Sequence, residues 1–357
     1  MKSTSIIEAM GFNKISNFEP LVIISNAISG GGAEKSMMNL HQQFLSSGIN
    51  SFLIALNKSE PAGSMLNIKI LNRTWNEGTT STILNYFEFK KLFKQIDPKT
   101  VIANCELPEL YIALQSTKNR KIICVEHTTK PWHNKVCIGL LVRIILKIKK
   151  VYWVTVVSDR PKIWLGKANP TYIPNPYIVE DHKSNNHKPC LVYIGGLKSS
   201  KQPEMVIKAG IKNNIPVHMY GDGPLKTLLE EKYNDELCNI TFHGFNSKVW
   251  RQISRKSLII VPSDFEGDGL VVVEAVIQKF ALLLRDTKDF KRFAFESKHY
   301  FGTLSQLNTI ISNNLADSFE NLVVNEQSRL DLFVDRDLKQ VALKWEEFLQ
   351  FVSTNSK

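Results

Sequence analysis

Short apolar runs alternate with amphipathic segments along almost the whole chain. The expected strands of the first half are Leu21–Ser25, Ser51–Leu56, Thr100–Ala103, Ile122–Val125 and Val151–Val157. Those of the second half are Cys190–Ile194, Pro216–Tyr220, Ile240–Phe242, Leu258–Val261 and Ala281–Leu284. Helical patterns follow most of these runs, as is typical of parallel sheets with crossover helices. The sequence therefore predicts an α/β protein with doubly wound sheets.

A polar stretch divides the alternation into two similar halves. Residues 180–189 have no apolar periodicity, and 357 residues are enough for about two domains. We expect a first Rossmann-like domain at 1–180, a linker at 181–189 and a second Rossmann-like domain at 190–335. Residues 336–357 contain one more helix, in which Val341, Trp345 and Leu349 recur at helical spacing.

The composition is that of a globular protein, with 43% hydrophobic and 22% charged residues. It excludes a disordered chain, a collagen-like repeat and a small disulfide scaffold. No apolar run reaches the roughly 20 residues that span a bilayer, and residues 1–18 lack a secretory signal pattern. The five cysteines are scattered without a CxxC pair, so we expect reduced thiols in a cytoplasmic protein and no zinc site.

The net charge of +11 is concentrated in one segment. Residues 117–167 contain twelve Lys and Arg against two acidic residues, which is nearly the whole excess. The core of this segment mixes Leu, Ile and Val with five basic residues, which are Lys135, Arg143, Lys147, Lys149 and Lys150. This composition favours a helix on an anionic lipid surface. A domain helix with a solvated basic edge fits equally well. Nucleic-acid binding is a third alternative, but the segment lacks the aromatic residues interleaved with basic ones that such binding would need.

Three glycines, Gly30, Gly31 and Gly32, follow the first expected strand and precede a helix. They allow a tight turn and the approach of a ligand to amides at the helix N-terminus. The loop is not a Walker loop, because Glu34 stands directly before Lys-Ser, nor a dinucleotide fingerprint, because its third glycine position is Lys35. A tight turn with Glu34 at the positive helix end is the plainer alternative.

The second half places two glutamates eight residues apart. Glu266 lies in a glycine-rich loop, and Glu274 falls inside the apolar helix that begins near Leu270. A buried carboxylate costs several kcal/mol unless it is hydrogen-bonded. A sugar diol is a suitable partner because a carboxylate accepts two hydroxyl hydrogen bonds; capping a neighbouring amide is the alternative. A metal site formed by Asp264, Glu266 and Asp268 is a less favoured alternative.

These motifs together resemble glycosyltransferase family 4, retaining enzymes of the GT-B fold, over Leu21 to Leu284. The matching pieces are the Gly30 loop, His127, Val157-Ser158, Ile173-Pro-Asn-Pro, Gly221-Asp-Gly-Pro, His243-Gly-Phe and the Glu266/Glu274 pair. The resemblance implies two Rossmann-like domains facing each other across a cleft. It also implies a nucleotide-diphosphate-sugar donor, no metal cofactor, and a last helix at 336–357 that crosses back to the first domain.

The resemblance further implies residue roles. His127 contacts the donor sugar near the reacting carbon, Lys201 neutralises the leaving diphosphate, Glu266 holds sugar hydroxyls and Glu274 the ribose. The remaining expected donor-binding residues are Gly31, Gly32, Gly195, Gly196, Gly221, Asp222, Gly223, Pro224, Phe245, Gly267, Asp268, Gly269 and Leu270. Gly30, with the five basic residues above, is expected to serve the acceptor and the membrane surface.

Three departures from the family pattern are visible. Gly196 stands where the family usually has Arg, Asp268 replaces an apolar residue, and residues 278–281 replace a Gly-Thr-Pro stretch. We expect a hexosyltransferase, peripheral on the inner face of the cytoplasmic membrane, that acts on a lipid-linked saccharide for a surface polysaccharide such as lipopolysaccharide. Because the arginine is absent, a non-catalytic nucleotide-sugar- or lipid-binding partner of another transferase is the alternative. A dinucleotide-dependent oxidoreductase is disfavoured, because Lys35 occupies the third glycine position of the dinucleotide fingerprint.

Overall fold

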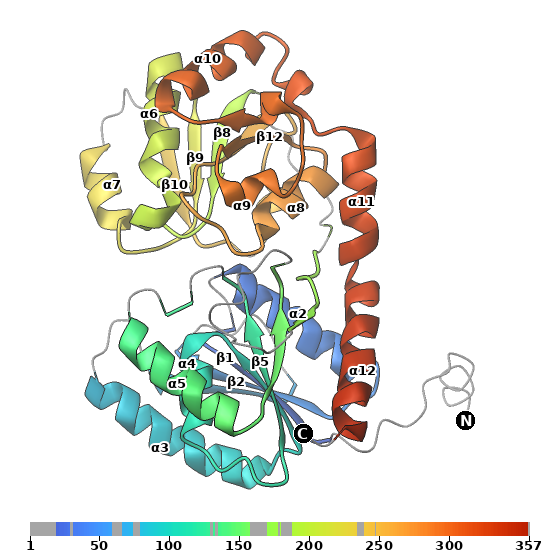
Figure 1. Ribbon diagram of the computed structural model, residues 1–357. Coiled ribbons are helices and arrows are strands. Elements are labelled where there is room, and N and C mark those ends of the chain that lie inside the picture. The colour runs from blue at the N-terminus through green and yellow to red at the C-terminus, as the bar shows by residue number, and fades with distance from the viewer. Residues whose placement is uncertain are drawn as a thin grey trace. The chain divides into compact units, whose positions relative to one another are not determined.

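The chain folds into two compact units (Figure 1). A computed structural model describes residues 19–28, 31–58, 66–73, 79–128, 131–132, 135–157, 170–177, 179, 188–233, 239–246 and 248–355. Unit 1 comprises Met1–Ser29, Ala33–Pro174 and Leu338–Lys357, and unit 2 comprises Gly30–Gly32 and Asn175–Asp337.

Unit 1 is built on a parallel sheet with the strand order β3-β2-β1-β4-β5-β6-β7. The strands are β1 (Leu21–Ser25), β2 (Ser51–Asn57), β3 (Ile68–Arg73), β4 (Thr100–Asn104), β5 (Lys121–Glu126), β6 (Tyr152–Thr155) and β7 (Thr171–Tyr172). The helices are α2 (Gly32–Ser46), α3 (Thr79–Ile96), α4 (Glu106–Ala113), α5 (Val136–Ile148) and α12 (Leu338–Thr354). The order reverses between β1 and β4, where ligands of doubly wound sheets bind.

The last helix, α12, belongs to unit 1. Val341, Trp345 and Leu349 are buried in one core cluster with Leu21 and Ile23 of β1. Leu343, on the opposite side of the helix, is exposed. The helical spacing in the sequence therefore marks the face that closes this core.

Unit 2 repeats the plan with the strand order β10-β9-β8-β11-β12-β13, again parallel. The strands are β8 (Cys190–Ile194), β9 (Val217–Tyr220), β10 (Ile240–Gly244), β11 (Ser257–Val261), β12 (Ala281–Arg285) and β13 (Tyr300–Phe301). The helices are α6 (Pro203–Asn213), α7 (Lys226–Lys232), α8 (Leu270–Ile277), α9 (Lys288–Lys291), α10 (Leu304–Asn314) and α11 (Glu326–Arg336). The order reverses between β8 and β11.

Unit 2 begins at Asn175, a few residues before the expected end of the first domain at 180. The reason is Tyr177, which is buried against Leu270, Val273 and Ile277 of α8. Of the expected linker 181–189, residues 181–187 lie outside the described residues. The unit boundary is thus fixed by packing and not by the polar stretch.

All ten expected strands are present, with ends that differ by a few residues. Three strands were not expected from the pattern: β3, β7 and β13. Each lies at the end of a sheet, where one side has no partner strand and the apolar run is correspondingly short or interrupted. The α/β prediction is confirmed. Among the described residues, no helix combines the length and apolar character that a bilayer span requires.

Candidate active site

Three loops of unit 2 meet at the carboxyl edge of its sheet. They follow β8, β9 and β11, and backbone hydrogen bonds join them: Leu197 N–H donates to Asp222 O at 2.9 Å, and Asp264 N–H donates to Ser200 O at 3.0 Å. Because β8 and β11 are neighbours at the point where the strand order reverses, this edge is the expected ligand position of a doubly wound sheet.

Two glycines allow these loops to approach so closely. Gly221 has φ +137°, and a Cβ there would lie 1.9 Å from Gly195 O. Gly223 has φ +157°, and a Cβ there would lie 2.5 Å from Leu197 O. Any larger side chain would push the β9 loop away from the β8 loop. The Gly221-Asp222-Gly223-Pro224 turn is therefore required by the backbone.

Gly196, in contrast, has room for a side chain. A Cβ there would meet nothing closer than Asp222 O at 3.8 Å and Lys198 Cε at 3.9 Å. The residue that departs from the family pattern is therefore not held as glycine by its surroundings.

Lys201 and Glu266 form an ion pair between the β8 loop and the β11 loop. Both side chains are partly exposed, at 17% and 22%. The Glu266 backbone N–H donates to Asp289 Oδ2 of α9 at 2.9 Å, which anchors the loop. The structure thus brings together the two residues to which the sequence analysis assigned the diphosphate and the sugar hydroxyls.

The other two acids of this loop have partners of their own. Asp264 accepts a hydrogen bond from Gln202 Nε2 at 2.8 Å, and buried Asp268 pairs with Arg336 Nη1 of α11 at 2.7 Å. Among the described residues, no three His, Cys, Asp or Glu side chains come together as metal ligands.

Glu274 is buried within α8, as the apolar pattern predicted. Its Oε2 accepts a hydrogen bond from the indole Nε1 of Trp250 at 2.8 Å. The indole of a core side chain is thus one partner of this carboxylate. Glu274 is the fifth residue of α8, about one turn from the loop that carries Glu266.

The remaining expected donor residues lie on the same edge of unit 2. Gly269, at φ +73°, is the N-cap residue of α8, and Leu270 is its first residue, with a buried side chain. Phe245 follows β10 and is 51% exposed. Gly195 precedes Gly196, and Gly267 lies beside Glu266, to whose Oε1 its N–H donates at 3.2 Å. An amide-rich helix N-terminus and an exposed ring are suited to a phosphate and a base.

The glycine loop after β1 is grouped with unit 2, whereas the strands around it and most of α2 belong to unit 1. Gly31 precedes α2 and Gly32 begins it, while Gly30 lies outside the described residues. His127 directly follows β5, and burial lowers the pKa of its imidazole to about 3. The ring is therefore neutral at physiological pH.

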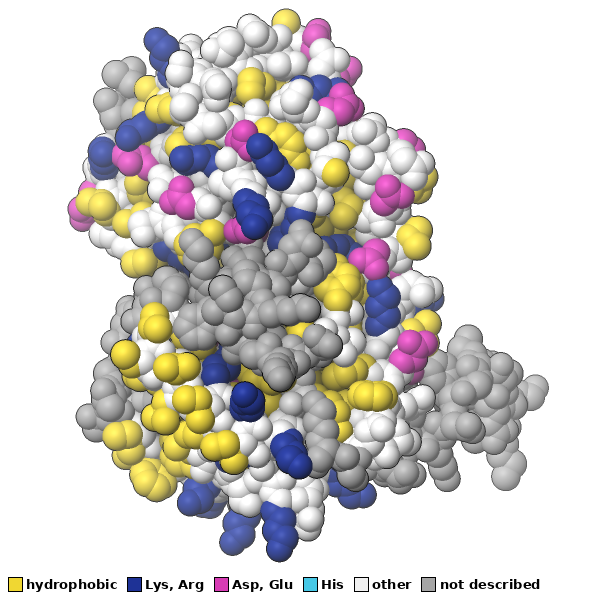
Figure 2. Space-filling model, in the orientation of Figure 1, with side chains coloured by type: hydrophobic (Ala, Val, Ile, Leu, Met, Phe, Trp, Pro, Cys, Tyr) yellow, Lys and Arg dark blue, Asp and Glu magenta, His cyan; other side chains and the backbone are white. Residues whose placement is uncertain are grey.

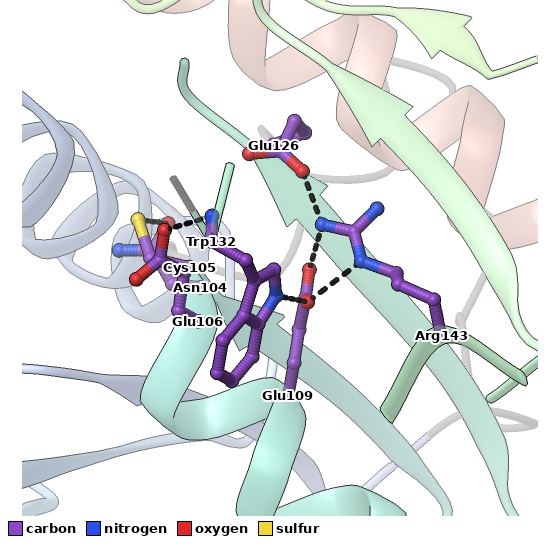
Figure 3. Close-up of polar contacts among 7 residues, drawn as sticks. All are labelled: Asn104, Cys105, Glu106, Glu109, Glu126, Trp132 and Arg143. Atoms are coloured by element: carbon purple, nitrogen blue, oxygen red, sulfur yellow. Dashed lines mark hydrogen bonds and ion pairs between the residues drawn. The ribbon is translucent and has the colours of Figure 1, made fainter. Parts of the chain in front are cut away.

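The expectation that Arg143 faces a membrane is wrong. Arg143 is 5% exposed and forms ion pairs with Glu109 Oε2, at 3.1 Å, and with Glu126. Figure 3 shows its guanidinium between the two carboxylates, with the Trp132 indole donating to Glu109. A basic residue in an apolar helix is here turned inward because two buried acids need its charge.

Lys149 is a second correction. Its ammonium donates to the carbonyl oxygens of Ile112, at 3.3 Å, and Ala113, at 2.7 Å, and also to that of Gln115. These carbonyls lie at or just after the C-terminal end of α4, so Lys149 caps that helix. Lys135, Lys147 and Lys150 are exposed. The expected basic set is therefore reduced from five residues to three.

The two acids that hold Arg143 were not predicted from the sequence. Glu106 and Glu109 on α4 lie, with Glu126, around Cys105, and burial together with these carboxylates raises the pKa of that thiol. The signal that was available is Glu126 itself, a charged residue at the end of an apolar strand. Its distance in sequence from Glu109 gave no indication that they share a partner.

Residues 176–303 match the family described as glycosyl transferases group 1. The matched segment contains the β8, β9 and β11 loops, and the match supports a transferase enzyme. The chain is also 27% identical over 125 residues to a poly(ribitol-phosphate) alpha-N-acetylglucosaminyltransferase of Staphylococcus aureus. That alignment covers 34% of this chain and 24% of the relative, so the chain matches about a quarter of that protein's length.

Solved structures resemble nearly the whole chain. Anabaena HepE in complex with UDP-glucose has a TM-score of 0.73 at 12% identity, over 92% of this chain and 99% of that one. Sucrose-phosphate synthase from Thermosynechococcus elongatus has a TM-score of 0.74 at 14% identity, over 94% and 99%. At these identities the likeness concerns the fold. The two Rossmann-like units form a GT-B fold.

Proposed function

We propose that this chain is a nucleotide-sugar-dependent glycosyltransferase, and more narrowly a retaining enzyme of family 4 that transfers a hexose to a saccharide acceptor. The observation that carries the proposal is the Lys201–Glu266 pair at the switch point of unit 2, within the segment that matches the group 1 transferases. In this pair a cation that can bind a diphosphate lies beside a carboxylate that can bind sugar hydroxyls.

The donor class is a sugar linked to a nucleoside diphosphate. The N-terminus of α8, with Gly269 and Leu270, offers backbone amides to an anion. Phe245 is exposed beside the Gly221–Pro224 turn, as a ring that stacks on a base would be. HepE, which has the same fold, was solved with UDP-glucose, and this supports the donor class.

The proposed chemistry is a displacement at the anomeric carbon with net retention. The bond from that carbon to the diphosphate oxygen breaks, and a bond to the acceptor oxygen forms on the same face. Negative charge develops on the diphosphate, where Lys201 and the α8 amides stabilise it. A diphosphate oxygen takes the acceptor proton. His127, neutral because of its lowered pKa, hydrogen-bonds the sugar without adding charge. No metal takes part in this proposal.

The acceptor we propose is a lipid-linked saccharide of a surface polysaccharide, lipopolysaccharide among them, used at the inner face of the cytoplasmic membrane. The relative from Staphylococcus aureus is named for transfer to a poly(ribitol phosphate), a polymeric acceptor. The exposed lysines of α5 in unit 1 are suited to an anionic lipid surface. Both observations support an acceptor presented on a surface.

Turnover of labelled nucleotide-sugars by the full chain tests the proposal. A panel of donors and a membrane extract as acceptor source are used first, and product formation is then compared for wild type, Lys201→Ala and Glu274→Gln. Lys212→Ala, an exposed lysine of α6, is the matched control. We expect both site variants to lose most activity and the control to retain it. Full activity in the two site variants would refute the proposal.

A non-catalytic nucleotide-sugar- or lipid-binding protein is the second candidate function. Gly196 favours it, because the cation that the family usually has at this position is absent. Isothermal titration with the donor that most raises the melting temperature separates the candidates. Binding of that donor, without transfer to any acceptor fraction, would favour the binding protein.

A further inference from the structure

Unit 1 exposes a large apolar surface. In the described part of the chain, half of the exposed large apolar side chains lie on α3, on α5 or directly after α4. This surface, the α3–α5 face, comprises Ile83, Leu84, Phe87, Leu114, Val136, Ile138, Leu140, Leu141, Ile144 and Ile148. Soluble monomers rarely expose a contiguous apolar patch above about 300–600 Å². The ten side chains of this face are each 46–75% exposed.

Hydrogen bonds through α4 hold this face together. Tyr111 Oη of α4 donates to Thr82 O of α3 at 2.9 Å, and Tyr86 Oη of α3 donates to Leu114 O at 3.1 Å. Lys149, which follows α5, donates to Ala113 O at 2.7 Å. Leu114 thus lies between the two helices. Figure 2 shows the hydrophobic side chains gathered over the region where Figure 1 places α3 and α5.

The inward side of α5 is already packed. Gly139, Val142, Arg143 and Leu146 are buried, and a Cβ at Gly139 would lie 2.4 Å from Trp132. The exposed apolar residues are therefore the second face of a helix whose first face is the core contact. The alternative of a domain helix with a solvated basic edge agrees with this packing and with the exposed Lys135, Lys147 and Lys150. Most of the remaining solvated face is aliphatic.

Charge indicates the partner of this face. Among the residues of α5 there is no Asp or Glu, and the exposed Lys135, Lys147 and Lys150 flank the helix or lie near its end. On α3, Lys91 and Lys94 follow Phe87 at spacings of four and seven residues, and the helix carries three lysines against one acid, Glu88. An apolar surface with a cationic border is complementary to an anionic bilayer, since the aliphatic groups enter the acyl region and the ammonium groups meet phosphates.

We propose that the α3–α5 face is a docking surface for an anionic lipid bilayer. The apolar side chains of α5 and the Ile83–Phe87 turn of α3 insert between lipids, and the three lysines at the ends of α5 contact headgroup phosphates. Arg143 and Lys149 take no part, because both are bound within the protein. This surface supplies defined contacts for the membrane position that was proposed with the function. The docking proposal itself rests on exposure and charge, and not on transferase activity.

Vesicle sedimentation with the full chain, without donor or acceptor, tests the proposal. We expect binding to vesicles of phosphatidylcholine with 30% phosphatidylglycerol, and at least tenfold weaker binding to phosphatidylcholine alone. Replacement of Lys147 and Lys150 by Gln weakens binding about fivefold per lysine at low salt. Lys212→Gln, at an exposed lysine of unit 2, leaves binding unchanged.

The apolar contribution is tested by Leu141→Glu and by Leu84→Glu, which change side chains that are 59% and 66% exposed. Leu228→Glu on α7, 57% exposed, is the matched control. We expect the first two to lose more than tenfold in binding while the melting temperature stays at the wild-type value. Wild-type binding by Leu141→Glu and Leu84→Glu would overturn the proposal.

Two other outcomes would each overturn the proposal. If the wild type is a dimer in gel filtration and Leu141→Glu is a monomer, while vesicles bind neither, the face joins two copies and the lipid proposal is wrong. If vesicles bind neither and both are monomers, the proposal is equally wrong. Because vesicle binding is measured without donor or acceptor, failure of docking and failure of the transferase remain distinguishable.

Discussion

The ammonium of Lys201 is paired with the carboxylate of Glu266 across two loops of unit 2. Under the proposed function, a bound diphosphate would compete for the same cation, and donor binding would exchange one anionic partner of Lys201 for another. We expect Lys201→Ala to lower kcat/KM by about 10²- to 10³-fold, as the loss of one preorganised charge does. Lys201→Arg retains part of the activity. Steady-state kinetics with the best donor measures both.

Gly196 is the position where an added cation has space. We expect Gly196→Arg to raise donor affinity about tenfold, since a charge-assisted hydrogen bond contributes roughly 1.5–3 kcal/mol. Gly196→Leu is the matched control, as it adds bulk without charge. Titration of the donor diphosphate measures the change; an equal effect of the two variants would contradict an electrostatic origin.

Trp250 and Glu274 form a buried pair in unit 2. Trp250→Phe leaves a buried carboxylate without the indole donor and is expected to destabilise the chain by about 1–3 kcal/mol. In Glu274→Gln the amide oxygen still accepts from the indole, so its stability changes less while donor affinity falls. Urea unfolding and donor titration of the same two variants separate the structural role from the binding role.

Arg143 holds two buried carboxylates in unit 1. Arg143→Met removes the cation that Glu109 and Glu126 share, and we expect a loss of about 3–5 kcal/mol in the free energy of unfolding. The triple variant with both glutamates changed to Gln recovers a large part of that loss. Chemical denaturation followed by tryptophan fluorescence measures it, and a loss below about 1 kcal/mol in Arg143→Met would contradict the buried pair.

His127 predicts a pH dependence of stability. Its folded pKa of about 3 is below the unfolded value near 6.5. The unfolded state therefore binds the proton first, and the contribution of His127 is fully present above pH 6.5 and is lost as the pH falls below it. Between pH 7 and pH 5 the melting temperature of the wild type should fall more than that of His127→Asn. Parallel curves would show that the imidazole is not buried.

Nine of the ten predicted strands were predictable because most of their residues are buried, so that each is an apolar run between polar turns. The exception is β10, which alternates between partly buried and exposed residues. The direction of Arg143 was not predictable, since its partners Glu109 and Glu126 are 34 and 17 residues away in the chain. The same holds for Asp268, whose partner Arg336 lies 68 residues further on. Local pattern locates elements and loops, whereas the partner of a buried charge depends on tertiary packing.

The place of α12 has a consequence for synthesis. Its Val341, Trp345 and Leu349 complete the core around β1, yet the ribosome makes them after all of unit 2. A nascent chain therefore carries the first sheet with an open apolar side while the second unit is already able to fold. The core around β1 is completed only after α12 has left the ribosome. Until then, a chaperone that binds apolar surface can bind the uncovered side of the first sheet.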